Sequence, residues 1–206
     1  MLFRSSQVHG HDVWRASRAA LRNVSAPPTA DGVITTEPGV VCAVMVADCL
    51  PVLVADRFGR AVGAFHAGWR GLAGAGDMAG QGILETGVAH MLAATGGQAS
   101  DLLAWLGPCI GPTSFQVGAD VLRGFGVEPA ALAGTGFRVD PACAVGAPKW
   151  LADLPALAAQ RLRALGVGQI RASGLCTVSS PDRFFSYRRD GQTGRQAALI
   201  ALAPAA

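Results

Sequence analysis

Runs of apolar residues separated by turn residues predict several β-strands in the first third of the chain. Val33–Thr36 is short and β-branched, and Val40–Val46 is apolar throughout, as expected for a strand buried on both faces. Pro51–Ala55 and Ala61–Phe65 follow as two further strands, with turn residues at positions 56–59 between them. This part of the chain is therefore predicted to be mainly β-sheet.

Two later segments have the spacing of amphipathic helices. Leu72–Ala94 is predicted as one helix that ends at Gly96, and Asp153 is a suitable N-cap for a second helix with Pro155 in its first turn. Further strands are predicted at Leu102–Leu106, Gln169–Ala172 and Ala197–Leu202. Strands that follow one another, with helices to cover them, indicate an α+β fold with mixed sheets.

The size and composition of the chain indicate a globular protein. Its 206 residues predict a single domain over residues 1–206, and 50% hydrophobic residues suffice for a large core. The longest apolar stretch, residues 39–47, is far shorter than the ~20 residues that cross a bilayer. Residues 1–6 lack the apolar run of a signal peptide. We therefore expect a cytoplasmic protein without a membrane partner.

The charge pattern argues against nucleic acid as a partner. The formal net charge is only +3, and Lys and Arg do not form a run. Aromatic residues make up 6% of the chain and include one Tyr, too few for a platform that stacks bases.

Cysteine and histidine are few, which limits the possible metal chemistry. The five cysteines form no CxxC pair and, being odd in number, are predicted to be reduced thiols. Cys42, Cys143 and Cys176 are interpreted as small buried hydrophobic residues. The chain has four histidines.

Three of these side chains could meet at one crevice. Cys49 follows the strand that ends at Val46, and His66 follows the strand that ends at Phe65. If these ends are neighbours, a loop carrying His9 could add a third ligand, and three protein ligands with a fourth position open are typical of catalytic zinc. Alternatively, Cys49 is a buried hydrophobic residue, His66 is a hydrogen-bonded core residue, and His11 replaces His9 as the ligand. His90 is interpreted as structural or solvated.

Other polar residues lie close to these positions in the sequence. Arg70, between glycines at the start of the predicted long helix, is expected to bind an anion or to be a surface charge. Asp48 is either a turn residue or a partner of the metal site that carries a proton. Cys109, in a Gly-Pro-Cys-Ile-Gly turn, is expected in the pocket wall, and residues 186–190 are interpreted as an exposed loop.

Taken together, these segments resemble the YfiH family, long labelled multicopper polyphenol oxidoreductase or laccase-domain proteins. The resemblance covers nearly the whole chain, although members usually have a longer segment before the first motif. It rests on motifs that occur in the family's order: Gln7-Val-His-Gly10, Ala30-Asp-Gly-Val-Ile34, Ala47-Asp-Cys-Leu-Pro-Val52, His66-Ala-Gly-Trp-Arg-Gly71, Leu106-Gly-Pro-Cys-Ile-Gly111 and Phe184-Phe-Ser-Tyr-Arg-Arg-Asp-Gly191.

The resemblance implies a zinc site formed by His9, Cys49 and His66. It implies phosphorolysis of adenosine, inosine, guanosine and methylthioadenosine, deamination of adenosine, a four-layer α/β/β/α fold and a monomer. The substrates would be a purine nucleoside and phosphate. Asp48 and Arg70 are expected to act in catalysis, and Gln7, Arg70 and Cys109 to contact the substrate.

Our mechanistic hypothesis starts from charge. Zn²⁺ with one thiolate and two neutral imidazoles carries a net charge of about +1, so the pocket should attract phosphate near Arg70. Phosphate would attack C1′ of the ribose while the purine takes a proton from Asp48 or water. In deamination, a zinc-bound water with its pKa lowered to about 7 would attack C6 of adenine.

Three other functions compete with this hypothesis. A multicopper oxidase needs more soft or imidazole ligands than four histidines supply, although one copper ion could occupy the same site. A cysteine hydrolase would use Cys49 activated by His66, with Cys109 as the fallback nucleophile. A metal-binding protein without catalysis would leave Asp48 and Arg70 without a role.

Overall fold

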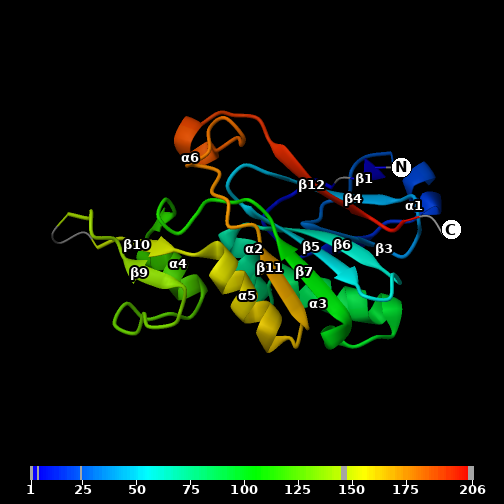
Figure 1. Cartoon of the computed structure of the whole chain (residues 1–206), viewed down its shortest axis with the longest axis horizontal. Coiled ribbons are helices and arrows are strands. Elements are labelled where there is room, and N and C mark those ends of the chain that lie inside the picture. Colours follow the sequence, from blue (N-terminus) through cyan, green and yellow to red (C-terminus); the bar gives the residue numbers. More distant parts are fainter. Residues whose placement is uncertain (1, 4, 24, 145–147, 204–206) are drawn as a thin grey trace.

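A six-stranded mixed sheet runs through the molecule (Figure 1). The computed structural model describes residues 2–3, 5–23, 25–144 and 148–203. The strand order is β11-β7-β5-β6-β3-β2, with parallel pairs at the two edges and antiparallel pairs between them. The strands are β2 (Val13–Arg15), β3 (Gly32–Thr35), β5 (Leu50–Asp56), β6 (Val62–Ala67), β7 (Leu102–Leu106) and β11 (Gln169–Ala172).

Each face of this sheet is covered by a different layer (Figure 1). On one face lies a three-stranded sheet of β1 (Leu2–Phe3), β4 (Val41–Val46) and β12 (Gln196–Ala201), in the order β1-β4-β12. Helices α3 (Ile83–Thr95) and α5 (Leu154–Ala164) lie on the other face. The predicted mixed α+β class is therefore confirmed.

The packing of Phe65 explains why α3 has a glycine, Gly87, in its interior. The side chain of Phe65 on β6 is 1% exposed. A Cβ at Gly87 of α3 would lie 2.6 Å from the Phe65 ring, and a Cβ at Gly32 of β3 would lie 2.8 Å from it. These glycines make room for the ring, and burying it contributes about 1.5–3 kcal/mol to stability.

A small third sheet, missed by the sequence analysis, lies at one end of the molecule (Figure 1). It contains β8 (Gln116–Val117), β9 (Phe137–Val139) and β10 (Trp150–Ala152), next to α4 (Ala119–Gly124). Strands of two or three residues are too short to show a period of two, so the hydrophobic pattern could not reveal them. The helices α1 (Arg18–Asn23) and α6 (Tyr187–Asp190) were also missed, because helices of six and four residues are too short to show the helical period of about 3.6.

The predicted helix over Leu72–Ala94 is wrong in its first half. The chain forms α2 (Trp69–Ala73) and a 3₁₀ turn, η1 (Gly76–Met78), before α3 begins; a second such turn, η2 (Ala99–Asp101), precedes β7. Gly74 has a φ of 67°, and a Cβ there would lie 2.5 Å from the carbonyl carbon of Gly80. Since glycine alone fits this reversal, the helix breaks there, and Arg70 belongs to a helix of five residues.

The second predicted helix and most predicted strands are found within a residue or two of their expected bounds. Asp153 caps α5 as predicted, accepting a hydrogen bond from the backbone N–H of Ala156 at 2.9 Å. We propose that the described residues form one domain, because one cluster of buried side chains extends from the six-stranded sheet to the small third sheet. None of the described helices has the length and apolar character needed to span a bilayer.

Candidate metal centre

The pairing of β5 with β6 brings Cys49 and His66 together. Cys49 directly precedes β5, and His66 lies opposite Pro51 in the antiparallel ladder. The sequence analysis placed His66 just beyond its strand, but β6 extends to Ala67 because its end pairs with the start of β5. The preceding strand, β4, belongs to the other sheet.

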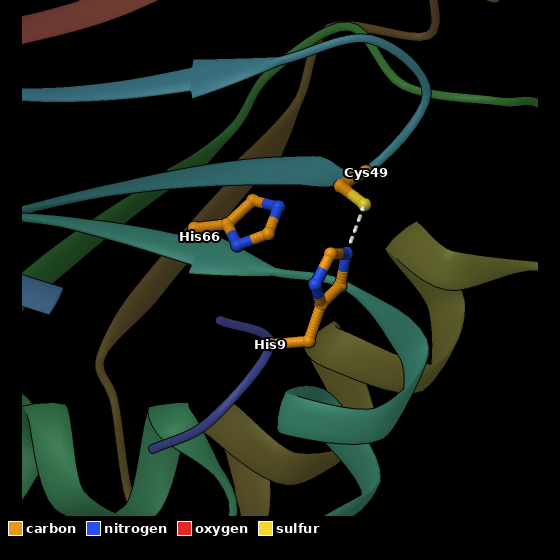
Figure 2. A group of neighbouring side chains, drawn as sticks. All are labelled: His9, Cys49 and His66. Atoms are coloured by element: carbon orange, nitrogen blue, oxygen red, sulfur yellow. Dashed lines mark hydrogen bonds between the residues drawn. The ribbon is translucent and has the colours of Figure 1, made fainter. Parts of the chain in front are cut away.

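Asp31 holds the loop that carries His9. The Asp31 carboxylate accepts hydrogen bonds from three consecutive backbone N–H groups, those of Val8, His9 and Gly10, at 3.0, 3.0 and 2.7 Å. His9 has a φ of 63°, the left-handed conformation, so the chain turns sharply around the carboxylate. The His9 imidazole then points toward Cys49, with 3.7 Å between Nε2 and Sγ (Figure 2).

His9, Cys49 and His66 form a compact His-Cys-His cluster (Figure 2). One ligand atom from each residue lies within 4.8 Å of the others. Tetrahedral zinc, with bonds of about 2.0–2.3 Å, needs ligand atoms roughly 3.3–3.6 Å apart, so a small inward movement completes the site. Gly68 leaves space for the cluster, since a Cβ there would lie 2.5 Å from His9 Cδ2 and 3.2 Å from Cys49 Sγ.

Asp31 also orients His66, a role that the sequence analysis missed. Its Oδ1 lies 2.7 Å from His66 Nδ1, and the Asp31 carboxyl is fully buried. This contact leaves His66 Nε2 for a metal, and a carboxylate behind a ligating imidazole is the usual support of such sites. Asp31 lies in the segment Ala30-Asp-Gly-Val-Ile34, but no local pattern indicated its partners.

Charges within the cluster favour a thiolate beside an imidazolium. Burial raises the pKa of the Cys49 thiol, but hydrogen bonds from His66 and His9 outweigh this and bring that pKa to about 6. Burial lowers the pKa of His66, while hydrogen bonds to Asp31 and Cys49 raise it to about 9. Burial raises the pKa of Asp31, yet its contacts with His66 and the backbone N–H groups bring it below its ordinary value.

These pKa values predict that metal affinity increases with pH. Between about pH 6 and 9 Cys49 is already a thiolate, so a metal displaces one proton, that of His66. The apparent affinity should then rise about tenfold per pH unit. Chelator-competition titrations with Zn²⁺ at about pH 6.5, 7.5 and 8.5 measure this slope. An affinity that is flat over this range would show that His66 is not a ligand.

Asp48 connects the cluster to the C-terminal part of the chain. Its Oδ1 accepts a hydrogen bond from the Thr177 hydroxyl and its Oδ2 one from the backbone N–H of Arg188, both at 2.6 Å. Asp48 has a φ of 89°, and such strain in a residue other than glycine persists only where surrounding contacts impose it. Because both carboxylate oxygens accept hydrogen bonds, Asp48 is a structural link between the cluster and the segments that contain Thr177 and Arg188.

A cavity of about 900 Å³ opens beside the cluster. This volume is within the range of pockets that bind small molecules. Its lining includes both histidines and the cysteine of the cluster, together with Gln7, Trp69, Arg70, Phe115, Tyr187 and Arg188. Tyr187 and Arg188, from the segment interpreted from the sequence as an exposed loop, therefore contribute to the cavity wall.

The remaining predicted site residues lie in different environments. Arg70 is exposed, lies 5.2 Å from the centre of the Trp69 ring and lines the cavity. Gln7 also lines it, but its amide exchanges two hydrogen bonds with the backbone of Met45, both at 2.8 Å. Cys109 is 1% exposed and its neighbour Ile110 lines the cavity instead.

Two alternatives from the sequence analysis find no support. Burial raises the pKa of Cys109, so this thiol is unsuited to be the fallback nucleophile. His11 Nδ1 contacts the carbonyl oxygen of Gln81, away from the cluster, so His9 supplies the imidazole from this loop. His90 is exposed on α3, as expected for a solvated residue.

Fold and cluster define a mixed α+β protein with a His-Cys-His group of metal-binding type at the end of its central sheet. The chain belongs to the multi-copper polyphenol oxidoreductase laccase family, whose model matches residues 1–203. The YfiH resemblance is thereby confirmed, since relatives with this name match almost the whole chain. The Escherichia coli purine nucleoside phosphorylase YfiH is 42% identical over 194 residues, which are 94% of this chain and 71% of the relative.

Other relatives agree in name and in fold. A Haemophilus influenzae purine nucleoside phosphorylase is 46% identical over 173 residues, 83% of this chain, and the match spans only 64% of that protein. A Neisseria meningitidis protein of known structure matches with a TM-score of 0.80 and 41% identity, over 98% of this chain and 75% of the other. YlmD from Geobacillus stearothermophilus matches with a TM-score of 0.83 and 29% identity, over 98% and 74% of the two chains.

Proposed function

We propose that this chain is a purine nucleoside phosphorylase whose metal ligands are His9, Cys49 and His66. The observation that carries the proposal is the His-Cys-His cluster on the wall of a cavity large enough for a nucleoside. The names of relatives at 42–46% identity support the reaction. Adenosine, inosine, guanosine and methylthioadenosine are the proposed substrates, and adenosine deamination is a proposed second activity.

The donor set fits zinc better than a group of copper ions. Two imidazoles and one thiolate suit either Zn²⁺ or a single copper ion. The remaining histidines, His11 and His90, lie elsewhere, and the described part of the chain contains one three-residue group able to hold a metal. A divalent ion there would supply positive charge and lower the pKa of a water molecule that reaches it.

The residues of this chain would bind the two substrates and stabilise charge. Arg70 is proposed to bind phosphate, since its guanidinium lines the cavity and makes no ion pair among the residues described. A phosphate oxygen would bond to C1′ as the bond from C1′ to the purine nitrogen breaks, and that nitrogen would take a proton. Water is a better proton source than Asp48, because both oxygens of Asp48 already accept hydrogen bonds.

Product analysis with and without phosphate tests the proposal. Purified protein of measured metal content is incubated with adenosine, and the products are separated. Adenine and ribose 1-phosphate that form only with phosphate would support phosphorolysis, and inosine formed without phosphate would support deamination. Free ribose formed without phosphate would contradict phosphorolysis, because water would then be the attacking group.

A cysteine hydrolase is the second candidate, favoured by the low pKa of Cys49 beside two imidazoles. Nucleophilic attack needs a free thiolate, so bound zinc and activity would exclude one another. Activity that rises when zinc is removed, and that iodoacetamide then abolishes, would favour this candidate. Activity that requires the metal would contradict it.

A further inference from the structure

Two consecutive arginines on α6 have very different surroundings. Arg189 forms an ion pair with Asp190 at 2.7 Å, and its guanidinium also donates to the carbonyl oxygens of Thr177, Val178 and Phe184. Its donors are therefore used within the protein. Within the described chain, the guanidinium of Arg188 donates one hydrogen bond, to the carbonyl oxygen of Gln116 at 3.1 Å, and it lines the cavity.

The position of Arg188 is fixed relative to the His-Cys-His cluster. Its backbone N–H donates to Asp48 Oδ2, and Asp48 directly precedes Cys49. Its guanidinium carbon lies 5.5 Å from the centre of the Phe115 ring, which also lines the cavity. Backbone and side chain are thus both held, so the remaining N–H donors are presented at little cost in conformational entropy.

The cavity has unbalanced positive charge. Arg70, Arg188 and Arg195 line it, and none of them forms an ion pair within the described ranges, whereas Arg60 and Arg161 elsewhere do. The one carboxylate in the lining is that of Asp48, whose oxygens are both engaged. A cavity of this kind attracts anions, and a guanidinium can donate two parallel hydrogen bonds to one phosphate.

We propose that Arg188 binds the phosphate co-substrate, an inference that rests on the function proposed above. Its free N–H groups donate to phosphate oxygens other than the attacking one. The attacking oxygen forms the bond to C1′, the C1′–N9 bond breaks, and its electron pair stays on N9, which takes a proton from water. Asp48 is then the positioning residue that holds Arg188 in place.

Kinetics of Arg188→Met and Arg188→Lys test this role. Both substitutions retain the backbone N–H that Asp48 accepts, so the link to the cluster is kept. Losing hydrogen bonds to a charged group should raise KM for phosphate about 10- to 100-fold in Arg188→Met, with partial recovery in Arg188→Lys. KM for the nucleoside should change much less than KM for phosphate. Arg171→Met, at an exposed position of β11, is the matched control.

The outcomes separate this inference from the proposed function. If wild-type protein performs phosphorolysis but Arg188→Met leaves KM for phosphate unchanged, Arg188 does not bind phosphate. If wild-type protein performs no phosphorolysis, the proposed function fails, and calorimetry with inorganic phosphate decides the inference by itself. Weaker phosphate binding in Arg188→Met than in Arg171→Met supports an anion site at Arg188. Equal binding in the two variants, or no binding to the wild-type protein, overturns it. If Arg188→Met does not fold, Arg188→Gln takes its place in every comparison.

Discussion

Replacing Cys49 with alanine is expected to abolish metal binding and to lower both proposed activities by about 10³-fold or more. Cys49 is the one thiolate of the cluster, and its Sγ lies 3.7 Å from His9 Nε2. Without it, two imidazoles remain, too few protein ligands for a catalytic zinc site. Metal analysis should find about one ion per chain in the wild type and almost none in Cys49→Ala.

Cys143→Ala is the matched control for this experiment. Cys143 is half-buried and is not among the residues that line the cavity. This variant should retain the metal and both activities. If Cys49→Ala folds, loses the metal and keeps full activity, the metal has no part in the reaction.

The second large effect is expected from Asp31→Ala. The fully buried Asp31 carboxylate contacts His66 and accepts three backbone N–H groups of the His9 loop, so its removal affects two ligands at once. Removing one partner of a buried ion pair should lower the free energy of unfolding by about 3–5 kcal/mol. Metal affinity should fall about 10- to 100-fold, because the imidazole loses its support. Denaturant unfolding and zinc titration measure the two effects.

Two further variants show whether the effect is specific to Asp31. Asp31→Asn keeps the size of the side chain but removes its charge, so the pKa of His66 should fall from about 9. NMR titration of the metal-free protein measures this change. Asp182→Ala, at an exposed loop position, should leave stability and metal affinity unchanged. If Asp31→Ala keeps the metal affinity of the wild type, Asp31 stabilises the fold but does not support the metal ligands.

The sequence was informative where a feature depends on neighbouring residues. Apolar periodicity located most strands of the central sheet and helix α5, because burial of one face leaves its period in the sequence. The same approach failed for Leu72–Ala94. There the apolar spacing continues past Gly74, but the backbone at Gly74 and Gly80 has positive φ values and reverses direction.

The same distinction between local patterns and long-range contacts applies to the candidate site. The mixed α+β class could be inferred from hydrophobic patterns, and His9, Cys49 and His66 stood out because they have reactive side chains next to glycines and strand ends. The support of two of them by Asp31, and the position of Arg188 at their cavity, became evident from the folded chain alone. Local patterns record which face of an element is buried. By contrast, the contacts of Asp31 with His66 and of Asp48 with Arg188 join distant segments, which meet only when the sheets have formed.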